Sequence, residues 1–303
     1  MADSLLHTLF ALLVWPGLLG GTVLAWFLSW LSRKLTARLQ GRQGPPFYQP
    51  FFDFFKLVGK QALLPRGLHP ALFYGLPLFG LIAVVFSLAL LPVSGAPGLS
   101  LSGDLILLVF LLEVPALVDV LAGFATPSIY SQVGSAREAL LSLAYNLPFI
   151  SALIAMALYL GSFRLEDFAN APIGPVTVLA AIALFTALLA RLKMNPFSIP
   201  NAEQEIVGGV HVEFNGLPLA LFELTHALEL AALSGVIALL FLGPVSAPWL
   251  RLLLYLLGSI LVVALASLVS AATARLKVQH AFRFYWTWGA AASALVFAAA
   301  LIF

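Results

Sequence analysis

Eight apolar segments, each about as long as a bilayer is thick, constrain this sequence more than any other feature. They occupy residues 8–31, 71–92, 104–125, 139–161, 174–190, 217–242, 250–272 and 283–303. A helix of about 20 apolar residues crosses the hydrocarbon core of a membrane. Only 9% of the residues are charged, against about 25% in soluble domains. We therefore expect an all-α integral membrane protein with about eight transmembrane helices, organised as a single polytopic domain over residues 1–303.

The basic residues predict how these segments are oriented. Thirteen of the 15 lie in the first, third, fifth and seventh connections, and only Arg164 and Arg251 lie elsewhere. Cytoplasmic connections carry the excess of lysine and arginine. The odd-numbered connections should therefore be cytoplasmic, and both termini should face the outside of the cell (inner) membrane. No basic residue precedes Arg33, so we interpret the first segment as a retained span rather than a signal peptide.

The first connection contains an amphipathic segment at 47–60. Gln49, Asp53 and Lys56 share one face of a helix there, and phenylalanines form the other face. A helix of this kind lies in the membrane interface, on the expected cytoplasmic side. Two interpretations are open: a simple lipid anchor, which the pattern alone favours, and a wall beside a site at the membrane surface.

Five ionisable residues fall inside two apolar segments, where each charge costs roughly 2.5–3.5 kcal/mol. They are Glu113 and Asp119 in the third segment and Glu223, His226 and Glu229 on one broad face of the sixth. Asp104 and Glu138 lie near segment ends, where the expected cost is lower. Such groups either join helices through hydrogen bonds or relay protons or sodium ions, and their number favours the relay.

The fifth connection is acidic, unlike the other cytoplasmic connections. It carries Glu203, Glu205 and Glu213. One interpretation is a surface helix with Asn201 as its N-cap and Gln204 closing a capping box. Acidic residues in the first turn suit the helix dipole, and such a helix is compatible with a functional role.

The composition excludes several kinds of protein. The chain has no cysteine, which rules out disulfides and cysteine-ligated zinc or iron–sulfur centres. Its five histidines have no metal-ligand spacing, and no P-loop, GxSxG or HExxH pattern occurs. A net charge of +2 gives no reason to expect nucleic acid. We expect neither a metal nor a redox cofactor in this chain, so any electron-transfer centre belongs to a partner.

Four segments on the expected cytoplasmic side carry a recognisable pattern. They read RKLTARLQGRQGPPFYQPFFDFFKL from residue 33, GSAREALLSLAYN from 134, PFSIPNAEQEIVGGVHVEF from 196 and ARLKVQHAFRFYW from 274. In this order they resemble the NADH dehydrogenase subunit 1 family, the H-type membrane subunits that anchor the peripheral arm of respiratory complex I. The resemblance covers nearly the whole chain. It implies eight spans and an outside N-terminus, in agreement with the count from hydropathy and charge.

The compact GPPFYQPFFDF and IPNAEQEIVGG segments look like the branch of group 4 membrane-bound [NiFe] hydrogenases, including formate hydrogenlyase. Complex I members carry extra residues in the first of these. The resemblance implies a membrane-anchor and ion-coupling subunit that docks a peripheral redox arm and links electron transfer to H⁺ or Na⁺ translocation. The implied partners are hydrogenase large and small subunits, an iron–sulfur subunit and antiporter-like membrane subunits, with the [NiFe] site and iron–sulfur clusters in those chains.

The charged residues divide into two expected groups. The candidates for ion translocation are Glu113, Asp119, Glu138, Glu203, Glu205, Glu213, Glu223, His226 and Glu229. The candidates for docking the peripheral arm are Arg33, Lys34, Arg38, Arg42, Asp53, Lys56, Arg137, Arg275, Lys277 and Arg283.

Asn146 and Gln279 depart from the family, because many members carry carboxylates at these positions. If those carboxylates move protons, the route here must differ or use water.

Two alternatives stay open: the quinone-site subunit of complex I, and a free-standing secondary ion transporter. The prolines and aromatic residues of 45–52 are expected to fill the slot that a quinone tail needs, although the same aromatic rings suit a quinone tunnel.

Overall fold

A computed structural model describes residues 2–93 and 103–302, and the elements in these ranges are helical. The helices are α1 (Ala2–Leu13), α2 (Leu18–Leu39), α3 (Gln49–Val58), α4 (Pro70–Leu90), α5 (Asp104–Ala125), α6 (Ile129–Leu160), α7 (Leu165–Ala169), α8 (Pro175–Arg191), α9 (Glu203–Ile206), α10 (Gly216–Leu239), α11 (Pro248–Ala272), α12 (Val278–Phe284) and α13 (Ala290–Ile302). A short 3₁₀ helix, η1 (Gly209–His211), precedes α10, and a π-helical turn, Tyr285–Gly289, joins α12 to α13.

The expected membrane spans are confirmed. Within the described residues, seven helical stretches are long and apolar enough to cross a membrane, and α8 is an eighth, shorter apolar helix. Two boundaries were placed wrongly. The first helical stretch continues to Leu39 and α6 begins already at Ile129, because backbone hydrogen bonds carry a helix beyond the apolar residues that mark the membrane. Glu138 therefore lies well inside α6, and its side chain is buried.

Proline marks the start of several helices. Pro50, Pro70, Pro175 and Pro248 occupy first-turn positions of α3, α4, α8 and α11. A first-turn residue has no intrahelical acceptor for its N–H, so proline loses nothing there and its fixed φ suits the helix.

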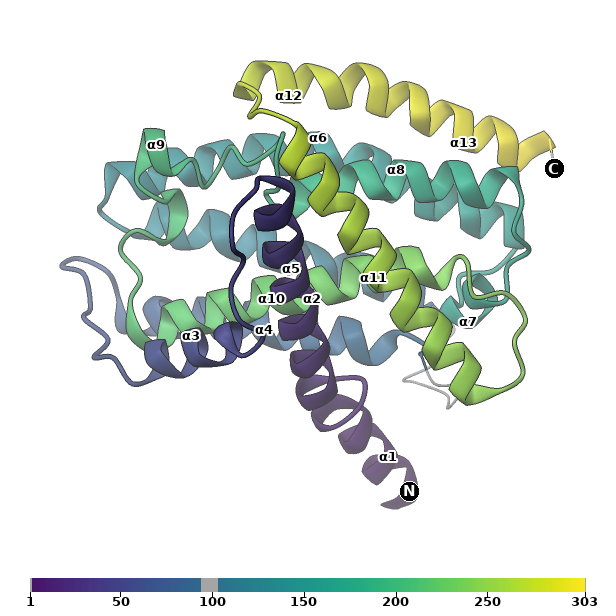
Figure 1. The fold of residues 1–303 in the computed structure, drawn as a ribbon, viewed down its shortest axis with the longest axis horizontal. Coiled ribbons are helices and arrows are strands. Elements are labelled where there is room, and N and C mark those ends of the chain that lie inside the picture. The colour runs from purple at the N-terminus through teal and green to yellow at the C-terminus, as the bar shows by residue number, and fades with distance from the viewer. Residues whose placement is uncertain (1, 94–102, 303) are drawn as a thin grey trace.

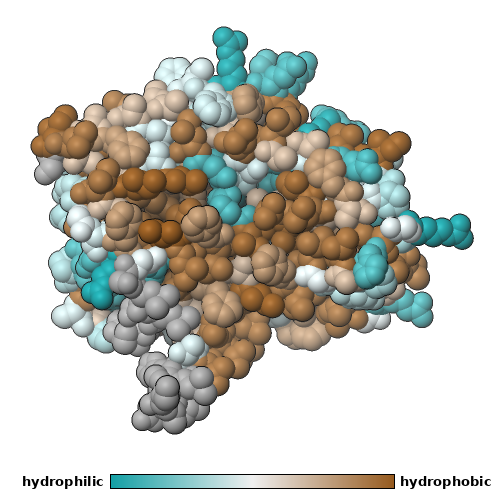
Figure 2. Space-filling view, turned by 180° about the vertical axis from the view of Figure 1, so that it is seen from behind, coloured by the Kyte–Doolittle hydropathy of each residue, from teal (hydrophilic) through white to brown (hydrophobic). Residues whose placement is uncertain are grey.

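The helices form one bundle around α10 (Figure 1). In the most apolar window of α10, 83% of the residues are buried, against at most half in the other spans. Helices α4, α5 and α8 run alongside it, α6 packs against α5 and α8, and α2 and α11 cross α10 obliquely. The helices α3 and α9 lie at one end of the bundle and α7 at the other, as alternating connections require. Figure 2 shows the broad hydrophobic surface that such a bundle presents to lipid, with hydrophilic residues towards the edges of the view.

Small residues let some helices approach closely. A Cβ atom at Gly123 of α5 would collide with Ser135 of α6, and one at Gly235 of α10 would collide with Tyr255 of α11. Membrane helices use such contacts because lipid provides no hydrophobic force between them.

Cysteine-accessibility labelling tests the orientation. Single cysteines at Lys60 and Gln204 should react only with a cytoplasmic reagent, and a cysteine at Ser246 only with an external one. All three residues are exposed, so access depends on the side of the membrane. Cytoplasmic labelling at residue 246 would contradict the predicted topology.

Candidate functional site

A buried arginine joins three helices inside the bundle. Arg191, the last residue of α8, has no exposed side-chain surface. Its guanidinium donates to Glu113 of α5 at 2.6 Å and to Glu229 of α10 at 3.0 Å, and also to the carbonyl of Leu112. Asn146 of α6 donates to the same Glu113 carboxylate at 2.8 Å.

Aromatic rings of α6 enclose this guanidinium. Its central carbon lies 4.9 Å from the ring centroid of Phe149 and 5.7 Å from that of Tyr145. A cation held over ring faces in a dry site gains a cation–π attraction in addition to its ion pairs. Arg191 is therefore enclosed by partners from α5, α6 and α10.

A second buried cation lies just past the end of α8. The Lys193 ammonium pairs with Asp119 of α5, and it lies 3.7 Å from a carboxylate oxygen of Glu138 on α6. The other oxygen of Asp119 is 3.1 Å from Nε2 of His211. Burial by itself would lower the pKa of Lys193, but Asp119 and Glu138 outweigh burial and raise this pKa, so the ammonium stays charged.

Glycines place His211 against this cluster. Gly209 adopts a positive φ of 66°, and a Cβ there would collide with the carbonyl oxygen of Pro200. A Cβ at Gly134 would lie 2.8 Å from the backbone nitrogen of Val210. The turn η1 can therefore press against α6, which brings the His211 ring to Asp119.

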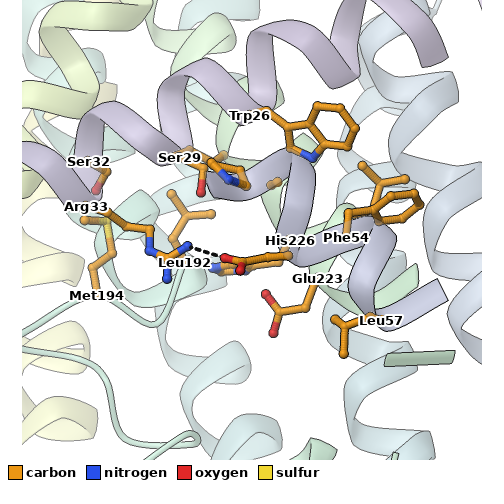
Figure 3. Close-up of a pocket in the computed structure, with 15 residues that line it drawn as sticks. Trp26, Ser29, Ser32, Arg33, Phe54, Leu57, Leu192, Met194, Glu223 and His226 are labelled. Carbon is orange, nitrogen blue, oxygen red and sulfur yellow. Dashed lines mark hydrogen bonds and ion pairs between the residues drawn. The ribbon is translucent and has the colours of Figure 1, made fainter. Parts of the chain in front are cut away.

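A cavity of about 450 Å³ opens beneath the amphipathic helix α3. Aromatic Trp26 and Phe54 lie on its wall, and Glu223 and His226 of α10 point into it (Figure 3). At its rim Arg33 donates to Asp53 at 3.2 Å. Helix α3 therefore forms the wall of a surface cavity, which supports the interpretation that the sequence pattern alone ranked second. In the 45–52 segment, the rings of Phe47 and Phe51 pack against Trp30 and Trp26 of α2, and Pro50 lines the cavity. That this segment excludes a quinone tail stays a prediction.

A small polar cavity of about 50 Å³ lies deeper in the bundle. Asp119, Lys193, His211 and Glu229 line it. Glu223 and His226 line both this cavity and the larger one. These two side chains are therefore the boundary between the surface cavity and the buried ion cluster.

The structure gathers most of the expected ion-translocation residues. Glu113, Asp119, Glu138 and Glu229 meet around the two buried cations, and Glu223 and His226 stand at the boundary between the cavities. Glu205 lies elsewhere, on the surface, with Arg137 at 2.6 Å and Arg275 at 3.9 Å. Glu213 makes no side-chain contact with the cluster among the described residues. The side chain of Glu203 lies outside the described set.

The expected docking residues are mostly exposed at the end that carries α3 and α9. Arg38, Arg42, Lys56, Lys277 and Arg283 are exposed. Lys34 instead donates to the carbonyl oxygens of Gly44 and Pro45, so it fixes the connection to α3. Arg33, Arg42 and Arg275 line a further open cavity of about 580 Å³ beside the end of α2.

Sequence reasoning missed the cations of this site. Arg191 and Lys193 counted only as cytoplasmic charge, yet both are buried partners of span carboxylates. Their position directly at the end of an apolar segment was the available signal. The proposed N-cap was also wrong: α9 begins at Glu203, and the buried carboxamide oxygen of Asn201 makes no hydrogen bond to any part of the chain that the structure describes.

Removing the central cation should destabilise the protein. In Arg191→Met, Glu113 and Glu229 lose their buried partner, which costs about 3–5 kcal/mol. We expect a marked fall in the unfolding temperature of the purified protein. The exposed Lys277→Met variant is the control and should change stability by no more than about 0.5 kcal/mol. Equal unfolding temperatures for Arg191→Met and wild type would contradict the structural role of Arg191.

Comparisons with known proteins agree with this architecture. A family model described as NADH dehydrogenase matches residues 13–301. The chain is 27% identical over 297 residues to the H subunit of NADH-quinone oxidoreductase from Dehalococcoides mccartyi, covering 94% of this chain and 84% of that protein. It is 33% identical over 253 residues to NADH-quinone oxidoreductase subunit 8 of Thermus thermophilus, covering 77% and 68% of the two chains.

A solved structure is similar over its full length. It belongs to a membrane-bound sulfane sulfur reductase, an archaeal respiratory membrane complex, and it matches with a TM-score of 0.88 and 30% identity over 98% of this chain and 99% of that chain. This chain belongs to the NADH dehydrogenase subunit 1 family and is a membrane subunit of a complex I-like oxidoreductase.

Proposed function

We propose that the chain anchors a peripheral redox arm and couples electron transfer in that arm to H⁺ or Na⁺ translocation. The observation that carries this proposal is the continuity of ionisable groups from the surface cavity into the bundle. Glu223 and His226 border the cavity, Asp119 and Lys193 follow, and Arg191 lies deepest among its carboxylates. Ionisable groups are costly inside a membrane and mark ion pathways there.

The charged surface at the α3 and α9 end supports docking of the arm. Glu205 lies between Arg137 of α6 and Arg275 of the α11–α12 connection, so one carboxylate links three segments of that surface. A change in the charge or position of the docked arm would alter the electrostatic potential at these side chains first. Because the chain has no cysteine, iron–sulfur clusters belong to the arm.

The acceptor is proposed to be soluble, and the group 4 [NiFe] hydrogenase type is the favoured form. Hydrogenase large and small subunits, an iron–sulfur subunit and antiporter-like membrane subunits would then be the partners. The compact 44–50 segment favours this branch. The chain also matches the sulfane sulfur reductase chain over 99% of its length, whereas it covers 84% of an H-type subunit of NADH-quinone oxidoreductase.

The cavity beneath α3 favours a second candidate, a quinone-reducing complex I subunit. Its volume of about 450 Å³ and its Trp26, Phe54 and Leu57 walls suit an apolar ligand. The free-standing transporter is a weaker interpretation, because the relatives are subunits of multisubunit complexes.

Glu223→Gln tests the coupling role. Glutamine keeps the size and hydrogen-bonding capacity of the side chain but cannot titrate. We expect the complex to assemble and transfer electrons, while ion translocation into vesicles falls roughly tenfold or more, as for loss of a proton-transferring group. Glu166→Gln, at the opposite end of the bundle, is the matched control and should translocate normally. Full translocation by Glu223→Gln would leave this carboxylate without a coupling role.

Acceptor assays separate the two candidates. The purified complex should evolve or consume hydrogen, or reduce another soluble acceptor, without added quinone, because the site of reduction lies in the arm. Quinone-site inhibitors should leave this activity unchanged. Quinone-dependent turnover that such an inhibitor abolishes would reject the soluble acceptor and establish the complex I candidate.

A further inference from the structure

Glu138 is the least compensated carboxylate of the buried cluster. Its side chain is 1% exposed, and within residues 2–93 and 103–302 neither of its oxygens makes a hydrogen bond. The Lys193 ammonium is 3.7 Å away, beyond hydrogen-bond distance, and is already paired with Asp119. A buried carboxylate without hydrogen bonds is strongly disfavoured in its ionised form.

Both cations that act on Glu138 are bonded to other carboxylates. Asp119 of α5 and Glu229 of α10 face it as negative groups, and Lys193 and Arg191 face it as positive groups. Arg191 bonds Glu113 and Glu229, and Lys193 bonds Asp119. With Lys193 in this position, four carboxyl groups, of which Glu138 and Glu229 are buried and Glu113 and Asp119 partly buried, share the two cations of this cluster.

Asp119 has a second partner, His211, so Lys193 can leave Asp119 without leaving it unpaired. The His211 ring lies 3.1 Å from the Asp119 oxygen that Lys193 does not use. If Lys193 turned from Asp119 to Glu138, Asp119 would keep His211. The two arrangements of Lys193 differ by a short side-chain rotation, because Glu138 Oε2 is already 3.7 Å from the ammonium.

We infer that Glu138 holds a proton as a neutral carboxylic acid while Lys193 is paired with Asp119, and that it releases this proton when Lys193 turns towards it. The step moves one proton and no electron: an O–H bond of Glu138 breaks, the ammonium compensates the new carboxylate, and water in the small polar cavity that Asp119 and Lys193 line accepts the proton. This assignment rests on the proposed coupling function and names the group within it that changes protonation.

Two further buried polar side chains lie on the same face of α6 as Glu138. Ser131 and Tyr145 lie seven residues before and after Glu138, about 10 Å away along the helix. Both hydroxyl groups are buried, and neither has a hydrogen-bond partner among the described residues. Glu138 therefore lies midway along a row of polar side chains that the described helices leave unpaired.

Infrared difference spectroscopy of the purified complex during a pH titration tests this assignment. The wild type should show a carbonyl band of a buried carboxylic acid, and Glu138→Gln should lose it. Glu166→Gln removes a carboxyl group outside the cluster and should keep the band. Lys193→Gln removes the cation that would replace the proton, so the band should persist to higher pH than in wild type.

A second variant distinguishes loss of the carboxylic acid from a failure of the complex to assemble. Glu138→Asp keeps the acid with a shorter side chain and should shift the band rather than remove it. An unchanged band in both Glu138 variants would overturn the assignment. Because this measurement needs no turnover, it is independent of the coupling assay: a wild-type complex that shows the band but moves no ions would reject the proposed function and leave the protonation of Glu138 established.

Discussion

A guanidinium with no contact with water must find its compensation within the protein, and this requirement organises the centre of the bundle. Arg191 can be buried only if α5 supplies Glu113 and α10 supplies Glu229 at hydrogen-bond distance. Each of these carboxylates in turn would be costly to bury without the arginine. The three helices are thus tied together by groups that no one of them could bury alone.

The pairing at Lys193 differs from that at Arg191 in a way that suits function. Each of the three guanidinium nitrogens of Arg191 donates to a partner, two to carboxylates and one to a backbone carbonyl. Lys193 stands between two carboxyl groups and bonds only one of them. A fixed ion pair stabilises the bundle, whereas a cation with two alternative partners is the bistable element that the proposed coupling would require. Under that proposal the structural role falls on Arg191, the last residue of α8, and the switching role on Lys193, two residues later.

The helices were predictable because span length and apolar content depend on local sequence alone. The α3 helix and its apolar face were predictable for the same reason, from the period of its phenylalanines. Glu113 and Glu229 could be identified from the sequence as candidates because charged residues inside apolar segments are rare. Their partners were not found, since Arg191 ends its helix and looks like any cytoplasmic arginine until the fold brings α5 and α10 to it.

The sequence by itself determined that this chain enters a membrane, how many times it does so, and which segments carry charge into the apolar region. Only the tertiary structure decided which charges meet. It placed Lys193 between Asp119 and Glu138, made Glu223 and His226 the boundary of two cavities, and left Glu205 on the surface. The reason is physical: hydropathy acts residue by residue along the chain, but an ion pair depends on distances between helices, which only their packing fixes.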